Sequence, residues 1–170
     1  KKAKSQKWTY KKIAFELFKI MNPVSNNVNL NTSFKDYINF LTRHIKTKKN
    51  FSILDYGSGN GFTIFYLYKK KIFNKIYSKD VNQHFINLQK KIIKPLNYEI
   101  LTPGKNIIKE KTKSIDWVIS NAVLHCLPSK KNAKNLILEM VRIAKKGVLI
   151  SDIFNAQYKE KFIDHQMKRQ

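Results

Sequence analysis

The sequence predicts an α/β fold in which a parallel sheet carries helices on both faces. From residue 51 onward, short apolar runs alternate with segments of helical periodicity, as expected where helices connect parallel strands. The first apolar run leads into a turn with three of the five glycines of the chain, Gly57, Gly59 and Gly61. Such spacing marks a strand-to-helix turn at which a ligand approaches bare backbone.

The first 50 residues predict helices ahead of this core. A first amphipathic helix is indicated by apolar residues at helical spacing, namely Tyr10, Ile13, Ala14, Leu17, Phe18 and Met21. Pro23 ends it, and Ser33 with Asp36 forms a capping-box signature for a second helix. The apolar stripe of the second helix is Phe34, Tyr37, Ile38, Leu41 and Ile45. We interpret both stripes as core packing, although a lid over a substrate pocket has the same pattern.

We therefore divide the chain into an N-terminal helical cap segment, residues 1–50, and a core, residues 51–170. In the core, strands are expected over residues 51–55, 76–80, 98–101, 115–121 and 148–152. Helices are expected over residues 60–70, 82–94 and 155–170, and from the N-cap Ser129 to Gly147. The apolar face of the helix that Ser129 begins is expected to hold Ala133, Leu136, Ile137, Met140, Val141 and Ala144.

The composition is that of one globular domain. Hydrophobic residues make up 42% and aromatic residues 12% of the 170 residues, which excludes an intrinsically disordered chain. No apolar run approaches the roughly 18 residues that a membrane-spanning helix needs, so we expect no membrane span. A single cysteine, Cys126, excludes an internal disulfide framework and fits a reducing compartment. We expect a cytoplasmic protein.

The formal net charge of +23 leaves two interpretations open. A polyanionic partner such as RNA would account for it. However, arginine, which binds phosphate and base edges best, occurs only at Arg43, Arg142 and Arg169. The many Lys, Asn, Ile, Phe and Tyr residues also fit the coding bias of an AT-rich genome. We favour coding bias with solvated helix faces over a nucleic-acid partner.

The glycine turn has the spacing D-x-G-x-G-x-G, beginning at Asp55. A dinucleotide-binding turn, G-x-G-x-x-G, would need glycine at position 62, where the chain has Phe62. A phosphate-binding P-loop would end in Gly-Lys-Ser/Thr, which is absent. A backbone cradle beside a carboxylate suits a zwitterionic amino acid with its own ammonium group better than a pyrophosphate.

Four segments resemble, in order, the motifs of class I S-adenosylmethionine-dependent methyltransferases. ILDYGSGNGF resembles the first motif, and IYSKDVN resembles the second, with Asp80 placed 19 residues after Gly61. SIDWVISNAVLHCL is similar to the fourth-strand motif of the small-molecule branch, of methyltransferase type 11 and 12. LILEMVRIAKKGVLISDI resembles the helix and strand that follow. The resemblance covers about 60% of the chain and implies a Rossmann-like core.

The resemblance implies S-adenosylmethionine as cofactor and S-adenosylhomocysteine as product. Asp55 would help to hold the methionine ammonium, Asp80 the ribose hydroxyls, and Val81 would pack on the adenine. The remaining implied cofactor-binding residues would lie along the amino-acid part, namely Gly57, Ser58, Gly59, Gly61, Ser120 and Asn121.

The chain departs from the family pattern at three places. Thr102 and its neighbours stand where the family usually has an acid near the adenine amino group. Lys145-Lys146-Gly147 replaces the usual Lys-Pro-Gly-Gly. Nothing after Asp152 can supply the two further strands of the family, so we expect the C-terminal strands 6 and 7 to be missing by truncation.

Candidate catalytic residues follow the fourth and fifth strands. His125 is the first candidate for a general base toward an oxygen acceptor, although a packing histidine at a helix start fits equally well. Asp152 is the second candidate. We interpret Cys126 as a small buried hydrophobe, and no His, Cys or Asp cluster has metal-ligand spacing.

The expected function is methyl transfer to a small-molecule acceptor, an oxygen, with sugars or glycans as the acceptor class. One alternative is an RNA methyltransferase of the same fold. A second is a non-catalytic remnant that binds the cofactor or a partner protein. The oligomeric state is left open.

Overall fold

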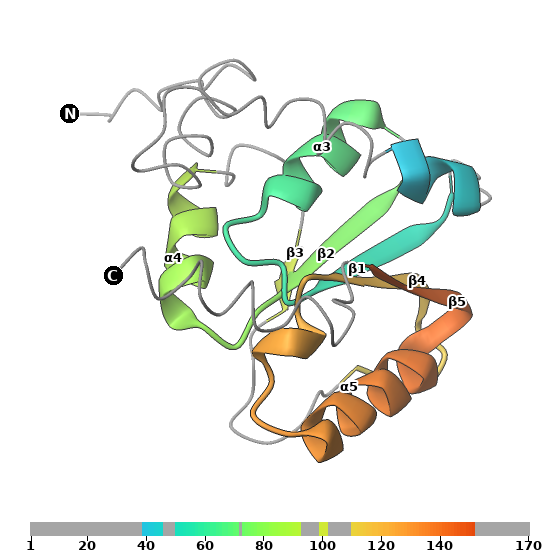
Figure 1. The fold of residues 1–170 in the computed structure, drawn as a ribbon. Coiled ribbons are helices and arrows are strands. Elements are labelled where there is room, and N and C mark those ends of the chain that lie inside the picture. Colours follow the sequence, from blue (N-terminus) through green and yellow to red (C-terminus); the bar gives the residue numbers. More distant parts are fainter. Residues whose placement is uncertain (1–38, 46–49, 72, 93–98, 102–109, 152–170) are drawn as a thin grey trace.

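The computed structural model describes residues 39–45, 50–71, 73–92, 99–101 and 110–151. The described strands form one parallel sheet of order β3-β2-β1-β4-β5 (Figure 1). In chain order, the elements of the core are β1 (Ser52–Tyr56), α3 (Phe62–Lys70), β2 (Lys75–Lys79), α4 (Gln83–Ile92), β3 (Glu99–Leu101), β4 (Ile115–Asn121), the 3-10 helix η1 (Leu124–Cys126), α5 (Lys130–Ile143) and β5 (Ala144–Ser151). This confirms the predicted α/β class.

The strand order reverses at β1, which pairs with β2 on one side and β4 on the other. Asp55 near the end of β1 lies opposite Ser78 of β2 and Ile119 of β4. Connections leave such a reversal point in opposite directions, which opens a crevice at the carboxyl ends of the strands. The sequence therefore places the glycine turn where open α/β sheets bind ligands.

Each face of the sheet buries its own apolar core, since neighbouring strand residues point to opposite faces. Ile53 packs with the buried residues of α3 and with Ile92 of α4, whereas Leu54 packs with Leu136 and Met140 of α5. Figure 1 shows α3 and α4 on one side of the sheet and α5 on the other. Leu41 and Ile45 are buried in the first of these cores. The other residues of the predicted N-terminal stripes lie outside the described residues.

The predicted junction between the last helix and the fifth strand was wrong. Ser129 does cap α5, its Oγ accepting a hydrogen bond from the Asn132 amide (3.2 Å). However, α5 ends at Ile143, and Gly147 lies inside β5 opposite Trp117. A Cβ at Gly147 would lie 2.5 Å from ring carbon Cζ3 of Trp117, so the indole ring accounts for the glycine. Two residues expected on the apolar helix face also differ, because Ala144 begins β5 and Val141 is 49% exposed.

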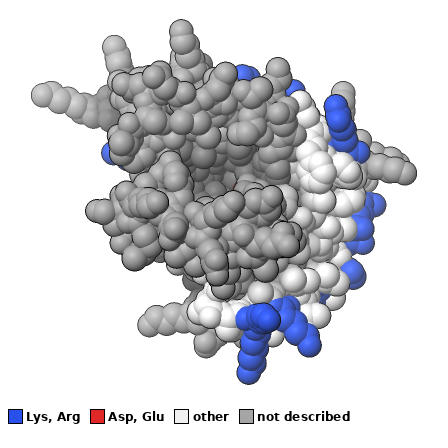
Figure 2. Space-filling model, in the orientation of Figure 1, with Lys and Arg blue, Asp and Glu red and all other residues white. Residues whose placement is uncertain are grey.

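Apart from Lys130, Lys131 and Lys134 at the start of α5, which follows the carboxyl end of β4, the exposed lysines of the described ranges gather at the amino-terminal edge of the sheet, the edge opposite the glycine turn. They come from the ends of α3 and α4, the turn before β4 and the starts of β2 and β5, and are Lys69, Lys70, Lys71, Lys75, Lys90, Lys91, Lys111, Lys113, Lys145 and Lys146. We call this set the lysine edge. In Figure 2, blue side chains lie on the side of the molecule where Figure 1 places the starts of these strands, and a further blue group lies at the bottom, where Figure 1 shows the start of α5. Two of the six described acids, Asp55 and Asp80, lie at the carboxyl ends instead.

Among the described residues, no helix is long and apolar enough to cross a membrane, as expected.

Candidate functional site

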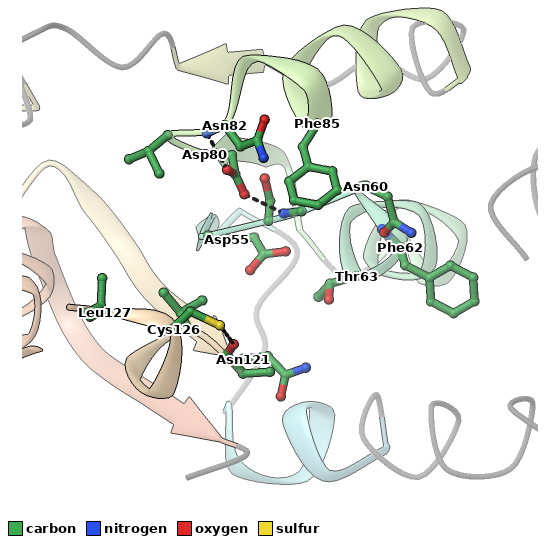
Figure 3. Close-up of a pocket in the computed structure, with 16 residues that line it drawn as sticks. Asp55, Asn60, Phe62, Thr63, Asp80, Asn82, Phe85, Asn121, Cys126 and Leu127 are labelled. Atoms are coloured by element: carbon green, nitrogen blue, oxygen red, sulfur yellow. Dashed lines mark hydrogen bonds between the residues drawn. The ribbon is translucent and has the colours of Figure 1, made fainter. Parts of the chain in front are cut away.

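A cavity of about 430 Å³ opens at the carboxyl ends of β1, β2 and β4 (Figure 3). Seven of the residues that the resemblance implies line it, namely Asp55, Gly57, Ser58, Gly59, Asp80, Val81 and Asn121. The structure therefore brings together, in one hollow, residues that are spread over 67 positions of the sequence.

The three glycines of the turn all have positive φ, at +78° for Gly57, +53° for Gly59 and +84° for Gly61. A Cβ at Gly57 would collide with the side chain of Val123, so this glycine also lets η1 approach the turn. Around Gly59, by contrast, a Cβ would meet no atom within 4 Å. Gly59 therefore faces open space at the cavity, where a ligand can lie directly against the backbone.

The amides of the turn donate hydrogen bonds within the protein. Those of Gly57 and Ser58 donate to the Lys79 carbonyl (2.8 and 3.1 Å), and that of Gly61 donates to the Ser58 carbonyl (2.9 Å). The Gly59 amide donates to Asp80 Oδ2 (2.7 Å), and the Phe62 amide donates to Asn60 Oδ1 (3.2 Å). A pyrophosphate cradle needs such N–H groups aimed at the ligand. These five amides are therefore not aimed at a pyrophosphate in the cavity.

Two buried carboxylates, Asp55 and Asp80, give the cavity a negative side. Burial, and then the nearby charge of Asp80, raises the pKa of Asp55 from 3.8 to about 7, against a hydrogen bond from Thr63 that lowers it. Asp80 Oδ1 accepts a hydrogen bond from the Asn82 amide (2.8 Å), in addition to the Gly59 amide on Oδ2. Figure 3 shows both carboxylates among the side chains around the hollow. A cation between them would lower the free energy of both ionised groups.

Lys79, the described lysine nearest to Asp80 in the sequence, does not neutralise the charge of Asp55 and Asp80. Lys79 precedes Asp80, but its ammonium bonds to Glu110 (2.9 Å) and lies 5.9 Å from the centre of the Tyr56 ring. Burial, followed by the charges of Glu110 and Glu139, raises the pKa of Tyr56 to about 12. Lys79 thus belongs to a separate polar cluster, and the two carboxylates remain available to a cationic ligand.

The opposite side of the cavity is formed by the end of β4 and by η1. Asn121 Oδ1 accepts a hydrogen bond from Ser151 Oγ (2.9 Å), which fixes the orientation of the amide. Ala122 follows with φ +57°, and the chain then turns into η1. Val123 and Leu127 add an apolar surface to this side. This side therefore offers one oriented amide and apolar contacts.

Of the predicted site residues that the structure describes, three do not line the cavity. Gly61 forms the N-cap of α3, and Ser120 is 1% exposed with a buried Oγ that has no hydrogen-bond partner. His125 is exposed on η1. Asp152 lies outside the described residues.

The interpretation of Cys126 as a buried hydrophobe was wrong. Cys126 is exposed at the cavity, and its thiol lies 3.6 Å from the Ala122 carbonyl oxygen, which accepts its hydrogen bond. The 3-10 turn of η1 brings Cys126, rather than His125, to the cavity wall.

Sequence reasoning missed several lining residues from the first turns of α3 and α4 and from η1, namely Asn60, Phe62, Thr63, Asn82, Phe85, Ala122, Val123, Cys126 and Leu127. Their position just after the motif strands was a usable signal, because helix starts border the carboxyl edge of a parallel sheet. No described group of His, Cys, Asp and Glu is arranged to hold a metal ion.

A family model described as a methyltransferase domain matches residues 47–170. No curated protein matches the chain.

Solved structures share the fold at low identity. A putative S-adenosylmethionine-dependent methyltransferase from Methanococcus maripaludis is 15% identical with a TM-score of 0.63, over 99% of this chain and 75% of that one. An S-adenosylmethionine-dependent methyltransferase from Methanosarcina mazei is 17% identical with a TM-score of 0.62, over 76% of this chain and 64% of that one. The YcgJ protein from Bacillus subtilis is 12% identical with a TM-score of 0.58 over 76% of this chain, which spans only 56% of its length.

Proposed function

Because the chain belongs to the methyltransferase-domain family, we propose that its cavity binds S-adenosylmethionine for methyl transfer to a small-molecule acceptor. The turn carries this proposal: five of its amides are bonded inside the protein, and two buried acids stand beside it. A ligand with an ammonium group fits this arrangement, whereas a pyrophosphate does not. S-adenosylmethionine is the methyl donor that the family implies.

The residues present fit this cofactor. Gly59 offers open space for the amino-acid part, and Asp55 offers a carboxylate for the ammonium. Each Asp80 oxygen accepts one amide hydrogen bond and has capacity to accept a ribose hydroxyl as well. Val81 is 82% exposed at the cavity edge, where a planar base would cover it.

When bound, S-adenosylmethionine supplies a methyl group already activated by its sulfonium. The protein therefore has to hold the acceptor in line and exclude water. Asn121, whose amide is oriented by Ser151, offers a polar group to the acceptor on this side, and Val123 and Leu127 add apolar surface that excludes water. An oxygen acceptor, sugars included, would gain from a general base, for which His125 and then Asp152 remain our candidates.

The charge distribution favours a small acceptor over RNA. The lysine edge lies at the end of the sheet opposite the cavity, and the cavity itself carries two acids. A phosphate backbone drawn to the lysine edge would be held away from the cavity, and only Lys130, Lys131 and Lys134 of the exposed lysines in the described ranges lie on the cavity side. A non-catalytic remnant is less favoured, because Asp55, Asp80 and the three glycines are all in place at one hollow. The helical cap segment and the cytoplasmic location remain predictions.

Calorimetry on the protein tests the proposal. We expect heat of binding with S-adenosylmethionine and S-adenosylhomocysteine, and none with NAD. Gly59→Val should abolish binding, because the new side chain enters open space that only a ligand would occupy; the φ of +53° also strains a β-branched side chain, so some loss of stability is expected as well. Binding of NAD without binding of either sulfur compound would refute the proposal, as would undiminished affinity in a folded Gly59→Val protein.

A further inference from the structure

Beneath the glycine turn lies a closed cycle of three polar side chains from three elements. Gln89 of α4 donates from Nε2 to Ser58 Oγ (2.9 Å), and the Ser58 and Ser78 hydroxyls are bonded to each other (2.8 Å). Ser78 of β2 donates to Gln89 Oε1 (2.5 Å), which closes the cycle. The three residues are 0% (Gln89), 7% (Ser58) and 1% (Ser78) exposed.

The cycle leaves one amide hydrogen of Gln89 for the turn itself. That hydrogen is donated to the Gly59 carbonyl (2.5 Å). The orientation of the amide follows from the network, since the opposite orientation would set Oε1 against that carbonyl oxygen. The Gly59 carbonyl thus selects the orientation of the amide, and the bonds to Ser58 and Ser78 hold the amide in place.

Gly59 is therefore held by side chains on both sides of its α-carbon. Asp80 accepts from its N–H (2.7 Å), and Gln89 donates to its C=O. No side chain packs where its Cβ would be, so hydrogen bonds rather than packing fix its φ of +53°.

We propose that Gln89 is a positioning residue of the cavity, which clamps Gly59 in its left-handed conformation and thereby sets the affinity for the ligand. Gln89 does not line the cavity and acts through the turn. The identity of the ligand in this proposal rests on the proposed function, whereas the hydrogen bonds that hold Gly59 do not depend on it.

A purely structural role for Gln89 explains less. Ile86 and Ile92 already bury α4 in the protein, at 1% and 4% exposure. An apolar side chain of similar length would fill the site of Gln89 without the cost of burying an amide. The bond to Gly59 gives the amide a function at this position.

The test compares Gln89→Met with a control on the same helix, Ile92→Val, which removes one buried methyl group. The first measurement is amide hydrogen exchange of residues 57–61 in the ligand-free full chain. We expect exchange to accelerate about ten-fold in Gln89→Met and to stay within two-fold in Ile92→Val. The second measurement is the Kd of S-adenosylhomocysteine, which should rise about ten-fold in Gln89→Met alone.

Two further variants keep the test decisive. Gln89→Glu preserves the size of the side chain and the acceptor for Ser78, but its carboxyl group has one hydrogen to donate when protonated and none when ionised, so it cannot serve both Ser58 and Gly59 and should raise both exchange and Kd. If Gln89→Met does not fold, Ser78→Ala, which frees the Gln89 amide to rotate, should show the same effects to a smaller degree.

Unchanged exchange and Kd in a folded Gln89 variant would overturn the clamp, as would equal effects in Ile92→Val. If the unmodified protein does not bind S-adenosylhomocysteine, the proposed function fails, and hydrogen exchange alone still decides on the clamp.

Discussion

Asp55 shows how the position of one residue sets its protonation. It is 2% exposed at the end of a buried strand and shares the cavity with Asp80. Burial, followed by the charge of Asp80, raises its pKa to about 7, so its carboxyl group is largely protonated in the ligand-free protein below neutral pH. An ammonium ligand would favour the ionised form, which couples binding to the loss of a proton.

This pKa predicts how stability depends on pH. Between the unfolded pKa of 3.8 and the folded value of about 7, the folded protein binds more protons than the unfolded chain. The free energy of unfolding should therefore fall as pH rises from 4 to 7, by at most about 4 kcal/mol, and level off above. Asp55→Asn should lack this component.

Urea unfolding of the unmodified protein and of Asp55→Asn at pH 4 to 8 measures this pH-dependent part of the free energy of unfolding. All other titratable groups are common to both proteins, so the difference between the two curves reports Asp55 together with its coupling to Asp80. Parallel curves would contradict the prediction.

At the scale of the element, the sequence predicted the strands and the helix starts, but not the junction between α5 and β5. The five strands and the cap at Ser129 follow from apolar runs and from a local side-chain bond, which the sequence displays directly. Gly147 was misassigned because glycine after a helical stripe usually ends the helix. Its actual reason is the ring of Trp117 on another strand, 30 residues earlier, and a contact of this kind leaves no local pattern.

The same limit applies to the site. The acids and glycines could be predicted because each lies at, or just after, the carboxyl end of a strand. Gln89 could not, because its partners, Ser58 and Ser78, belong to other elements. Its place on an amphipathic helix gave no sign of a bond to the turn.

We predict that Gly147→Ala destabilises the protein by about 1–3 kcal/mol, because the new Cβ would overlap the Trp117 ring. Strand propensity alone predicts the opposite sign, since glycine weakens a strand. Thermal or urea unfolding decides between the two.

Trp117→Leu provides the control, since it removes the ring and should make Gly147→Ala neutral or stabilising. An equal loss of stability in both backgrounds would show that the ring is not the reason for the glycine.

At the scale of the molecule, the lysine edge and the acidic cavity lie at opposite ends of the strands in the part that the structure describes, where Lys130, Lys131 and Lys134 are the exposed lysines on the cavity side. The formal charge of +23 makes the long-range field positive, while the two carboxylates act only near the cavity. The methyl donor has a net charge of +1, from a sulfonium, an ammonium and a carboxylate, whereas the demethylated product is a neutral zwitterion. The two ligands therefore meet the same field with different charges.

This separation has a kinetic consequence. At low salt the positive field, dominated by exposed lysines, should repel the donor before it reaches the cavity. Salt should screen that field, because the Debye length falls from about 30 Å at 0.01 M to about 10 Å at 0.1 M. We expect the association rate of S-adenosylmethionine to rise with salt over this range while that of S-adenosylhomocysteine stays nearly constant. Stopped-flow tryptophan fluorescence would measure both, and a donor rate that falls with salt would show that the cavity acids dominate the field. The ionic strength of the solution would then decide how fast the donor competes with its own product for the free protein.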